Sequence, residues 1–220
     1  MRSAILEKGE KHYTRMLKVF QSIENRQMDY NWLITNCECY SKNKKINDLF
    51  SQEYIWITGE QLTEIISKED FQFIWGVFSG FTKEFALEDV LKYDFPFADG
   101  YEGFWTDNVG IQHPLADIEI VAWDSSLTLF ISKKEYLVQK FMEFFPFAED
   151  LSVQNTRHNS QIAHIQELLI IELIRRNMEV SEKTLHIKYT VWRNLYANDI
   201  LYVSDGDISK CICDTLNKIS

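Results

Sequence analysis

Four cysteines form two identically spaced pairs, and they are the first residues to consider for chemistry. Cys37 and Cys39 lie in the first quarter of the chain, and Cys211 and Cys213 lie near its end. Four thiolates can hold zinc, but paired zinc ligands usually have about two to four residues between them, because the chain must curl around the ion. If Cys211 and Cys213 are on a helix, they also point about 200° apart around its axis. We therefore expect four reduced thiols, no metal and no other cofactor.

Of the five histidines, His113 is the one with loop residues and a carboxylate close by, in the sequence from Gly110 to Asp117. This is a setting in which a general base can act. No serine or cysteine with the local context of a nucleophile accompanies it. We therefore expect no catalytic residue, and a hydrolase that uses His113 and nearby carboxylates stays open as an alternative.

The acidic residues Asp117, Glu119 and Asp124 resemble the metal-binding carboxylates of a nuclease-like core in their spacing. Asp117 and Glu119 share one face of a predicted strand. Such cores usually place a lysine two residues after the acid, and here Val121 stands at that position. We therefore predict a solvated sheet face. The chain also has no phosphate loop, dinucleotide fingerprint or metalloprotease helix motif.

The segment 94–108 has the most unusual composition in the chain, with five aromatic residues, four carboxylates and two glycines within fifteen residues. It shows neither helical nor strand periodicity, and a loop of this length is usually functional. Aromatic anchors among charges are typical of a protein-binding hot spot. The alternative is that Phe95, Phe97 and Phe104 lie in the core. The predicted partner-binding residues are Asp94, Phe97, Asp99, Tyr101, Glu102, Phe104, Trp105 and Asp107.

The charge is distributed unevenly, and this bears on the kind of partner. Residues 51–150 carry 6 Lys and Arg against 19 Asp and Glu, so this part holds the acidic excess of a chain whose net charge is −10. Such a field repels a phosphate backbone and attracts a basic protein. We expect a basic protein partner and no nucleic acid. No signal-peptide pattern opens the sequence and no apolar run approaches the roughly 20 residues of a membrane span, so we expect a cytoplasmic protein with no membrane partner.

The element pattern up to residue 148 predicts an α+β domain with an acidic centre, in which an antiparallel sheet is covered by helices. Thr58 and Gln61 form a capping box that opens a helix, and Ser132 and Glu135 have the same spacing. The turn residues after Trp123 predict a hairpin. The expected helices are 4–24, 59–66, 82–93 and 135–144, and the expected strands are 30–35, 54–57, 71–78, 118–123 and 127–131.

Residues 149–160 lose apolar periodicity and predict a boundary, so residues 149–220 form a C-terminal α-β-β-α portion, a helix-hairpin-helix that is either separate or packed on the first domain. A mostly apolar helix over 161–175 is expected to be buried. Alternation over 185–192 predicts a strand, with 200–203 as its hairpin partner. Ser204 and Asp207 then cap a last helix to residue 219.

Three features together resemble the immunity proteins of bacterial polymorphic-toxin and contact-dependent inhibition systems. They are the strand start at residues 30–34, the segment 94–108, and the hairpin at 117–131 with its following helix. The resemblance covers about residues 28–145 and is shared with uncharacterised small bacterial proteins. It implies an acidic, cytoplasmic, non-enzymatic protein that neutralises one basic toxin domain. A structural or regulatory homo-oligomer that associates through the helix 161–175 is a further alternative.

Overall fold

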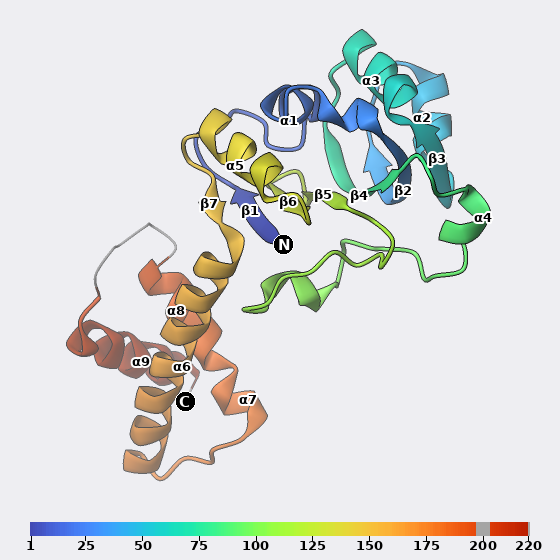
Figure 1. Cartoon of the computed structure of the whole chain (residues 1–220). Helices are drawn as coiled ribbons and strands as arrows, with labels where there is room; N and C mark the ends of the chain where they lie inside the picture. Colours follow the sequence, from blue (N-terminus) through green and yellow to red (C-terminus); the bar gives the residue numbers. More distant parts are fainter. Residues whose placement is uncertain (197–202, 220) are drawn as a thin grey trace. The chain divides into compact units, whose positions relative to one another are not determined.

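A seven-stranded antiparallel sheet organises the first of the two units into which the chain divides, residues 1–154 and 155–220 (Figure 1). The computed structural model describes residues 1–196 and 203–219. Every strand pair is antiparallel, and the order across the sheet is β3-β2-β4-β5-β6-β1-β7, which confirms the predicted α+β class. The strands are β1 (Arg2–Leu6), β2 (Tyr30–Cys39), β3 (Tyr54–Thr58), β4 (Phe73–Thr82), β5 (Ile118–Trp123), β6 (Leu127–Ser132) and β7 (Glu149–Asp150).

Helices cover one face of this sheet. Trp32 and Ile34 of β2 point into this layer, and the interleaved Leu33 points to the opposite face, as the two-residue period of a strand requires. Phe130 of β6 stacks on Phe141 of α5 with ring centroids 4.9 Å apart. The helices of the first unit are α1 (Met16–Ser22), η1 (Arg26–Asp29), α2 (Lys44–Phe50), α3 (Gly59–Lys68), α4 (Leu87–Val90), η2 (Glu102–Trp105) and α5 (Glu135–Phe144).

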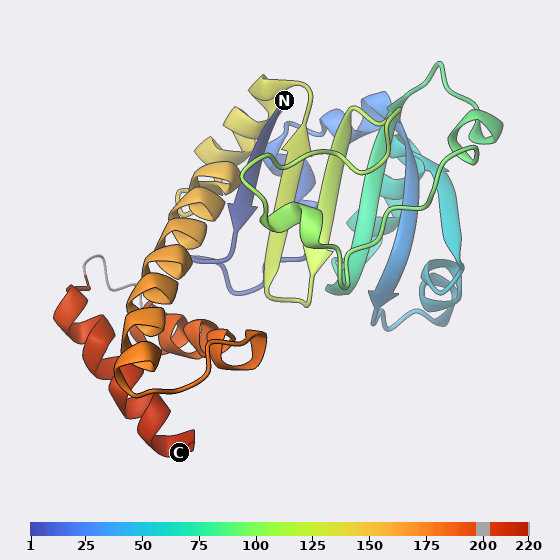
Figure 2. The ribbon, with the colours of Figure 1, turned by 90° about the horizontal axis from the view of Figure 1, so that it is seen from below.

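The opposite face is covered by the long connection between β4 and β5, residues 83–117, which has only the short elements α4 and η2 (Figure 2). Its residues Val90, Phe104 and Val109 are buried against side chains of the strands. Both faces of the central strands are therefore covered, which explains why those strands are almost continuously apolar.

Local signals in the sequence are confirmed where the contacts are local. Thr58 Oγ1 accepts the N–H of Gln61 and Gln61 Oε1 accepts the N–H of Thr58, so the predicted capping box opens α3. At the predicted hairpin turn, Asp124 and Ser125 have positive φ angles of 46° and 57°, and the N–H of Ser126 donates to Trp123 O. The strands at 30–35, 54–57 and 118–131 also lie where the pattern placed them.

Two predicted helices near the ends of strands are wrong in extent. The helix expected over 4–24 is α1 alone, because residues 2–6 form β1 and pair with both β6 and β7. A run of apolar residues fits either type of element, and here distant strands decide it. The helix expected over 82–93 is reduced to the single turn of α4, because Phe85 and Val90 are drawn down onto Leu33 and Phe81 of the sheet.

The capping box expected at Ser132 and Glu135 is absent from these described residues. Ser132 is the last residue of β6, and its hydroxyl oxygen accepts the N–H of Lys134, which precedes α5. The spacing of a capping box therefore occurs at a strand end, where the serine closes a turn instead of capping the helix.

The C-terminal unit contains helices where the sequence predicted a boundary loop and a strand. Residues 151–175 form one helix, α6, through the expected boundary at 149–160. Residues 185–192, expected as a strand, belong to helices, because Ile187, Val191 and Leu195 also recur every four residues and pack on the helical core. Of the expected partner strand 200–203, residues 200–202 lie outside the described residues, and Val203 is not in a strand. The helices are α6 (Leu151–Arg175), α7 (Glu182–Leu185), α8 (Ile187–Tyr196) and α9 (Asp205–Ile219).

The last helix is as predicted, but α6 is not fully buried. Ser204 Oγ accepts the N–H of Asp207 and Asp207 Oδ2 accepts the N–H of Ser204, which caps α9. In α6, Leu169 is buried, whereas Ile171 is 62% and Ile174 is 66% exposed. The helix therefore has one buried side, and its exposed side carries Ile171 and Ile174 among polar residues such as His164 and Glu167.

Candidate functional site

The segment 94–108 lies on the sheet face that helices do not cover, and its residues divide into core and surface. Phe104 is fully buried, so it cannot contact a partner in this structure, and its prediction as a partner-binding residue is wrong. Its ring packs on Tyr101 and Trp123, with centroids 4.7 and 6.1 Å away. Phe97 is 45% exposed. The four carboxylates of the segment, all exposed, are those of Asp94, Asp99, Glu102 and Asp107.

Half-buried tryptophans support this side of the molecule. Trp75 of β4 and Trp105 of the segment both contact the ring of Trp123 edge to face, at 5.1 and 5.0 Å. Edge-to-face pairs restrict ring motion and stabilise by about 0.5–1.5 kcal/mol beyond area burial. These rings therefore present fixed surfaces.

The backbone of the segment is held by polar side chains of β2 and of the loop before β5. Thr35 Oγ1 donates to Pro96 O at 2.6 Å. Asn36 Oδ1 accepts the N–H groups of Ala98 and Asp99 at 2.9 and 3.3 Å. Asn36 has a positive φ of 48° and lies where the register of β2 against β4 shifts. The bulge therefore aims this side chain at the segment.

Gln112 joins the segment to the buried Glu119. Its amide group accepts the N–H of Phe97 at 3.1 Å and donates to Phe97 O at 3.0 Å. Its backbone N–H donates to Glu119 Oε2 at 3.1 Å, and the Ser79 hydroxyl lies 3.5 Å from the same oxygen. A chain of hydrogen bonds thus runs from the sheet to the exposed Phe97.

Glu119 is fully buried, so the prediction of a solvated sheet face is wrong at this position. The residues 83–117 cover this face, which the local alternation of β5 does not reveal. Burial raises the pKa of Glu119 to about 8, because the hydrogen bonds compensate only in part for the loss of water. Its Oε1 has no hydrogen-bond partner within the described residues. Asp117 lies outside the sheet, with Lys133 and Lys134 within 3.8 Å.

His113 has a structural environment. Its ring is 1% exposed, and burial lowers its pKa. Nδ1 accepts the N–H of Leu115 at 3.2 Å, so Nε2 carries the proton and donates to Val90 O at 3.1 Å. Both nitrogens are therefore engaged by the backbone, and neither is free to take a proton from a substrate. This geometry counts against the hydrolase alternative.

An acidic groove opens where the segment meets the end of β2 and the start of β3. It has a volume of about 400 Å³, and its charged lining residues are Glu38, Glu53 and Asp99, all exposed. No lysine or arginine of the described residues lines it. Several elements contribute to its lining: Asn36, Cys37 and Glu38 come from β2, Gln52 and Glu53 precede β3, Trp75 comes from β4, and Asp99 comes from the segment.

Sequence reasoning found one residue of the acidic groove, Asp99, and missed the others. Glu38, Glu53 and Trp75 are separated by 15 to 37 positions in the chain, and the strand pairing between β2 and its neighbours brings them together. The acidic excess of residues 51–150 is a signal for such a surface, but it gives no position. Two smaller hollows, of about 230 and 360 Å³, share Glu38 and Glu53 with the groove, respectively.

The two cysteine pairs belong to different units. Cys37 and Cys39 lie at the end of β2, where a hydrogen bond with Cys39, together with burial, raises the pKa of the Cys37 thiol and the same hydrogen bond lowers the pKa of Cys39. The first thiolate to form is therefore that of Cys39. Throughout residues 1–196 and 203–219, no group of three or more histidine, cysteine or acidic side chains is arranged to hold a metal ion.

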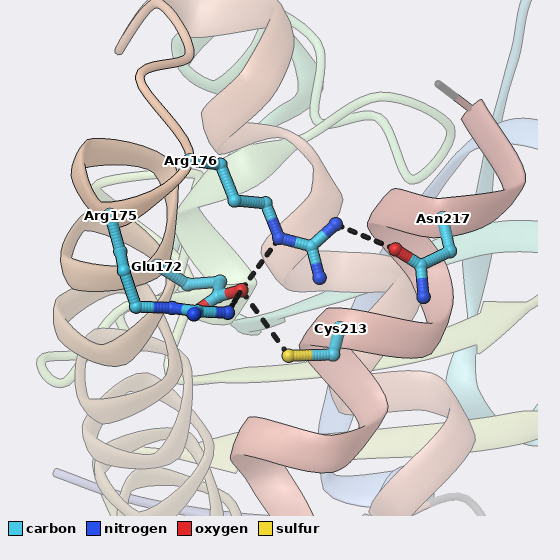
Figure 3. Close-up of polar contacts among 5 residues, drawn as sticks. All are labelled: Glu172, Arg175, Arg176, Cys213 and Asn217. Carbon is cyan, nitrogen blue, oxygen red and sulfur yellow. Dashed lines mark hydrogen bonds and ion pairs between the residues drawn. The ribbon is translucent and has the colours of Figure 1, made fainter.

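In the C-terminal unit, Cys213 of α9 takes part in a polar cluster with α6 (Figure 3). Its thiol donates to Glu172 Oε1 at 3.3 Å, and Arg175 and Arg176 donate to the same carboxylate at 2.6–2.7 Å. These hydrogen bonds lower the pKa of Glu172 to about 2. Arg176 also donates to Asn217 Oδ1 at 2.7 Å. The cluster links α6 to α9, and its carboxylate is already neutralised by two guanidinium groups.

Comparisons with known proteins gave a match for only the first part of the chain. A family model described as "Protein of unknown function (DUF2691)" matches residues 1–98. No curated protein and no solved structure matches the chain. Across the described residues, no helix is both long and apolar enough to cross a membrane. The matched range contains every lining residue of the acidic groove except Asp99.

Proposed function

We propose that this chain binds a basic protein domain at the acidic groove and blocks the activity of that domain, in the manner of the toxin-neutralising immunity proteins that it resembles. The observation that carries the proposal is the convergence of Glu38, Glu53 and Asp99 on one concave surface beside the ring of Trp75. We place this binding in the cytoplasm.

The electrostatic part of the proposal rests on three exposed carboxylates without a lining cation. Two opposite charges about 4 Å apart attract each other by about 1 kcal/mol in bulk water and by about 4 kcal/mol near a protein surface. Lysine and arginine side chains of a partner are the groups that such a surface attracts. Charges of this kind mainly accelerate association and suppress wrong partners.

The apolar part of the proposal rests on Trp75. Its indole lines the groove and is held against Trp123, so little side-chain freedom remains to be lost when a partner covers it. Tryptophan in a pre-organised position is a frequent binding hot spot, and arginine of the partner can stack on its face. Asp94, Phe97, Glu102 and Asp107 extend the same exposed segment beyond the groove.

The experiment starts from the gene neighbourhood, because immunity and toxin genes of this kind are expected to be adjacent. The product of the reading frame immediately upstream is expressed with and without this chain. We expect that product to inhibit growth, and co-expression of this chain to restore growth. Titration calorimetry of the two purified proteins is expected to give a dissociation constant that increases as the salt concentration is raised, because salt screens the attraction between charges. An upstream product that neither inhibits growth nor binds would contradict the proposal.

A charge-matched pair of double variants tests whether the partner binds at the groove. The double variant Glu38→Gln and Glu53→Gln removes two of its three carboxylates. Glu84→Gln and Glu88→Gln removes the same charge from exposed positions that do not line it. We expect the first double variant to weaken binding at least about tenfold and the second to change it little. Equal effects would show that net charge acts without a defined site.

A second candidate function is self-association through α6. The exposed Ile171 and Ile174 favour it, because large apolar side chains that lie three residues apart share one side of a helix. Sedimentation of the wild type against the double variant Ile171→Ser and Ile174→Ser tests it. A wild-type monomer at high concentration would exclude this candidate.

A further inference from the structure

Strand β3 is an unprotected edge of the sheet. It pairs with β2 on one side, and no described strand pairs with its other side (Figure 2). Natural edge strands are usually short, charged, bulged or covered, because an open edge is a template for pairing. The opposite edge follows this rule, since β7 is two acidic residues long. By contrast, β3 has five residues, Tyr-Ile-Trp-Ile-Thr, with no charge, no proline and an unbroken register.

The outward-facing amides of β3 can be assigned from its capping box. Thr58 donates its N–H to Gln61 Oε1 and therefore not to β2. The backbone N–H groups of a strand alternate between its two neighbours, so the N–H groups of Tyr54 and Trp56 also point away from β2. The amides of Ile55 and Ile57 then face β2. Two donors and their carbonyls are thus directed at the open edge.

A hollow of about 360 Å³ lies along this edge and is continuous in its residues with the acidic groove. It is lined by Leu49, Gln52, Glu53, Tyr54, Ile55 and Trp56, and it shares Gln52 and Glu53 with the groove. Its lining combines apolar side chains, those of Leu49, Ile55 and Trp56 among them, with polar surface that includes residues 52–53. An extended chain laid on β3 would therefore place side chains in this hollow and meet the Glu53 carboxylate at one end.

We propose that an extended segment of the basic partner, carrying lysine or arginine, adds to β3 as an eighth strand. This inference deepens the proposed function and rests on it. Backbone hydrogen bonds would supply affinity, and the hollow and Glu53 would supply specificity, as in other cases of strand addition. A second copy of the chain is the competing occupant. Each copy carries a net charge of −10, so charge opposes pairing between copies and favours a basic strand.

The first test uses amide hydrogen exchange of the wild-type protein with two synthetic decapeptides. One alternates valine and lysine, and the other alternates valine and glutamate. We expect the lysine peptide to slow exchange at Tyr54 and Trp56 at least about tenfold and to leave Ile55 and Ile57 unchanged, because only an added strand covers the outward amides. No protection by either peptide, or equal protection by both, would overturn the proposal. Concentration-dependent protection in the free protein would overturn it in favour of self-pairing.

The second test separates the backbone of the edge from its side chains. Trp56→Pro and Trp56→Val both remove the indole and its contact with Phe81, and only the proline removes the outward N–H. Each variant must show a cooperative melt. With the upstream-encoded product as ligand, we expect the proline variant to bind at least about tenfold more weakly than the valine variant. Equal affinities would overturn the edge proposal.

The two proposals fail in different ways. If the upstream product binds and is neutralised equally by both Trp56 variants, the edge proposal is wrong and the groove proposal stands. If that product does not bind the wild type at all, the proposed function is wrong, and the peptide exchange experiment alone still decides whether β3 accepts a basic strand.

Discussion

The two faces of the sheet are covered by different means. On one face, α1, α3 and α5 bury aliphatic and aromatic side chains in one continuous layer. A few side-chain hydrogen bonds, such as that from Trp32 Nε1 to Gln27 O, join this layer to the sheet. On the other face, the irregular residues 83–117 lie on a smaller apolar area and are fixed by named polar contacts, those of Asn36, Gln112 and His113 among them.

This difference shows how a loop can serve as a fixed surface. Helices satisfy most of their own backbone groups, so they are held on the sheet mainly by packing. An irregular segment must find partners for its N–H and C=O groups elsewhere, and side chains of the sheet and of the loop before β5 supply them here. The face with the less regular backbone is therefore the one that presents carboxylates at defined positions, beside the acidic groove.

The largest expected effect concerns the apolar anchor of the segment. Phe104→Ala removes a fully buried ring, and we expect it to lower the free energy of unfolding by about 3–5 kcal/mol. Phe97→Ala, at a half-exposed ring seven positions earlier in the same segment, is the matched control and should cost under about 1 kcal/mol. Urea denaturation measures both. Similar losses would mean that the segment is not anchored through Phe104.

The next effect concerns Glu119, which is joined to the segment through Gln112. Burial in the folded state raises the pKa of Glu119 to about 8, so the folded protein keeps a proton that the unfolded chain releases near pH 4.5. Stability from this group is therefore full below about pH 4.5 and is lost as the pH rises towards about 8. Glu119→Gln keeps the neutral shape. We expect it to come close to the wild type near pH 5 and to be more stable near pH 8.5 by about 3–5 kcal/mol.

Thermal or urea unfolding of both proteins at several pH values checks this prediction. The difference between them isolates Glu119 from the other groups that titrate in the same range. Parallel stability curves from pH 5 to 8.5 would show that the buried carboxyl has an ordinary pKa, and the segment would then be held without a pH-dependent anchor.

A smaller effect distinguishes the tryptophan of the groove from that of the segment. Trp75→Ala removes the ring that lines the groove and should weaken binding by about 2 kcal/mol, mostly through faster dissociation. Trp105→Ala removes a ring that contacts the same Trp123 but does not line the groove. If Trp105→Ala has the larger effect on folded protein, the partner covers the segment and not the groove.

The smallest effect concerns steering. Asp99→Lys reverses one exposed charge at the rim of the groove, and we expect it to slow association about threefold to tenfold and to flatten the salt dependence of the rate. Glu88→Lys makes the same charge change outside the groove. Stopped-flow association rates compare the two variants. A dissociation rate that changes more than the association rate in Asp99→Lys would place this carboxylate inside the interface.

Several elements of this protein were determined by the sequence alone, because the deciding contacts are local. The Thr58–Gln61 capping box, the turn at Asp124 and Ser125, and the cap formed by Ser204 and Asp207 each involve residues within three positions of one another. Their geometry follows from residue type and spacing, whatever the rest of the chain does.

Only the tertiary structure decided the rest. Residues 2–6 are a strand because β6 and β7 pair with them, and residues 187–196 are a helix although their alternation also fits a strand. Glu119 is buried because residues 83–117 cross its face, and Glu38, Glu53 and Asp99 share a groove because strand pairing joins distant positions. Periodicity fixes which residues share a face, but which segment covers that face depends on contacts between residues far apart in the chain, and no local pattern encodes those contacts.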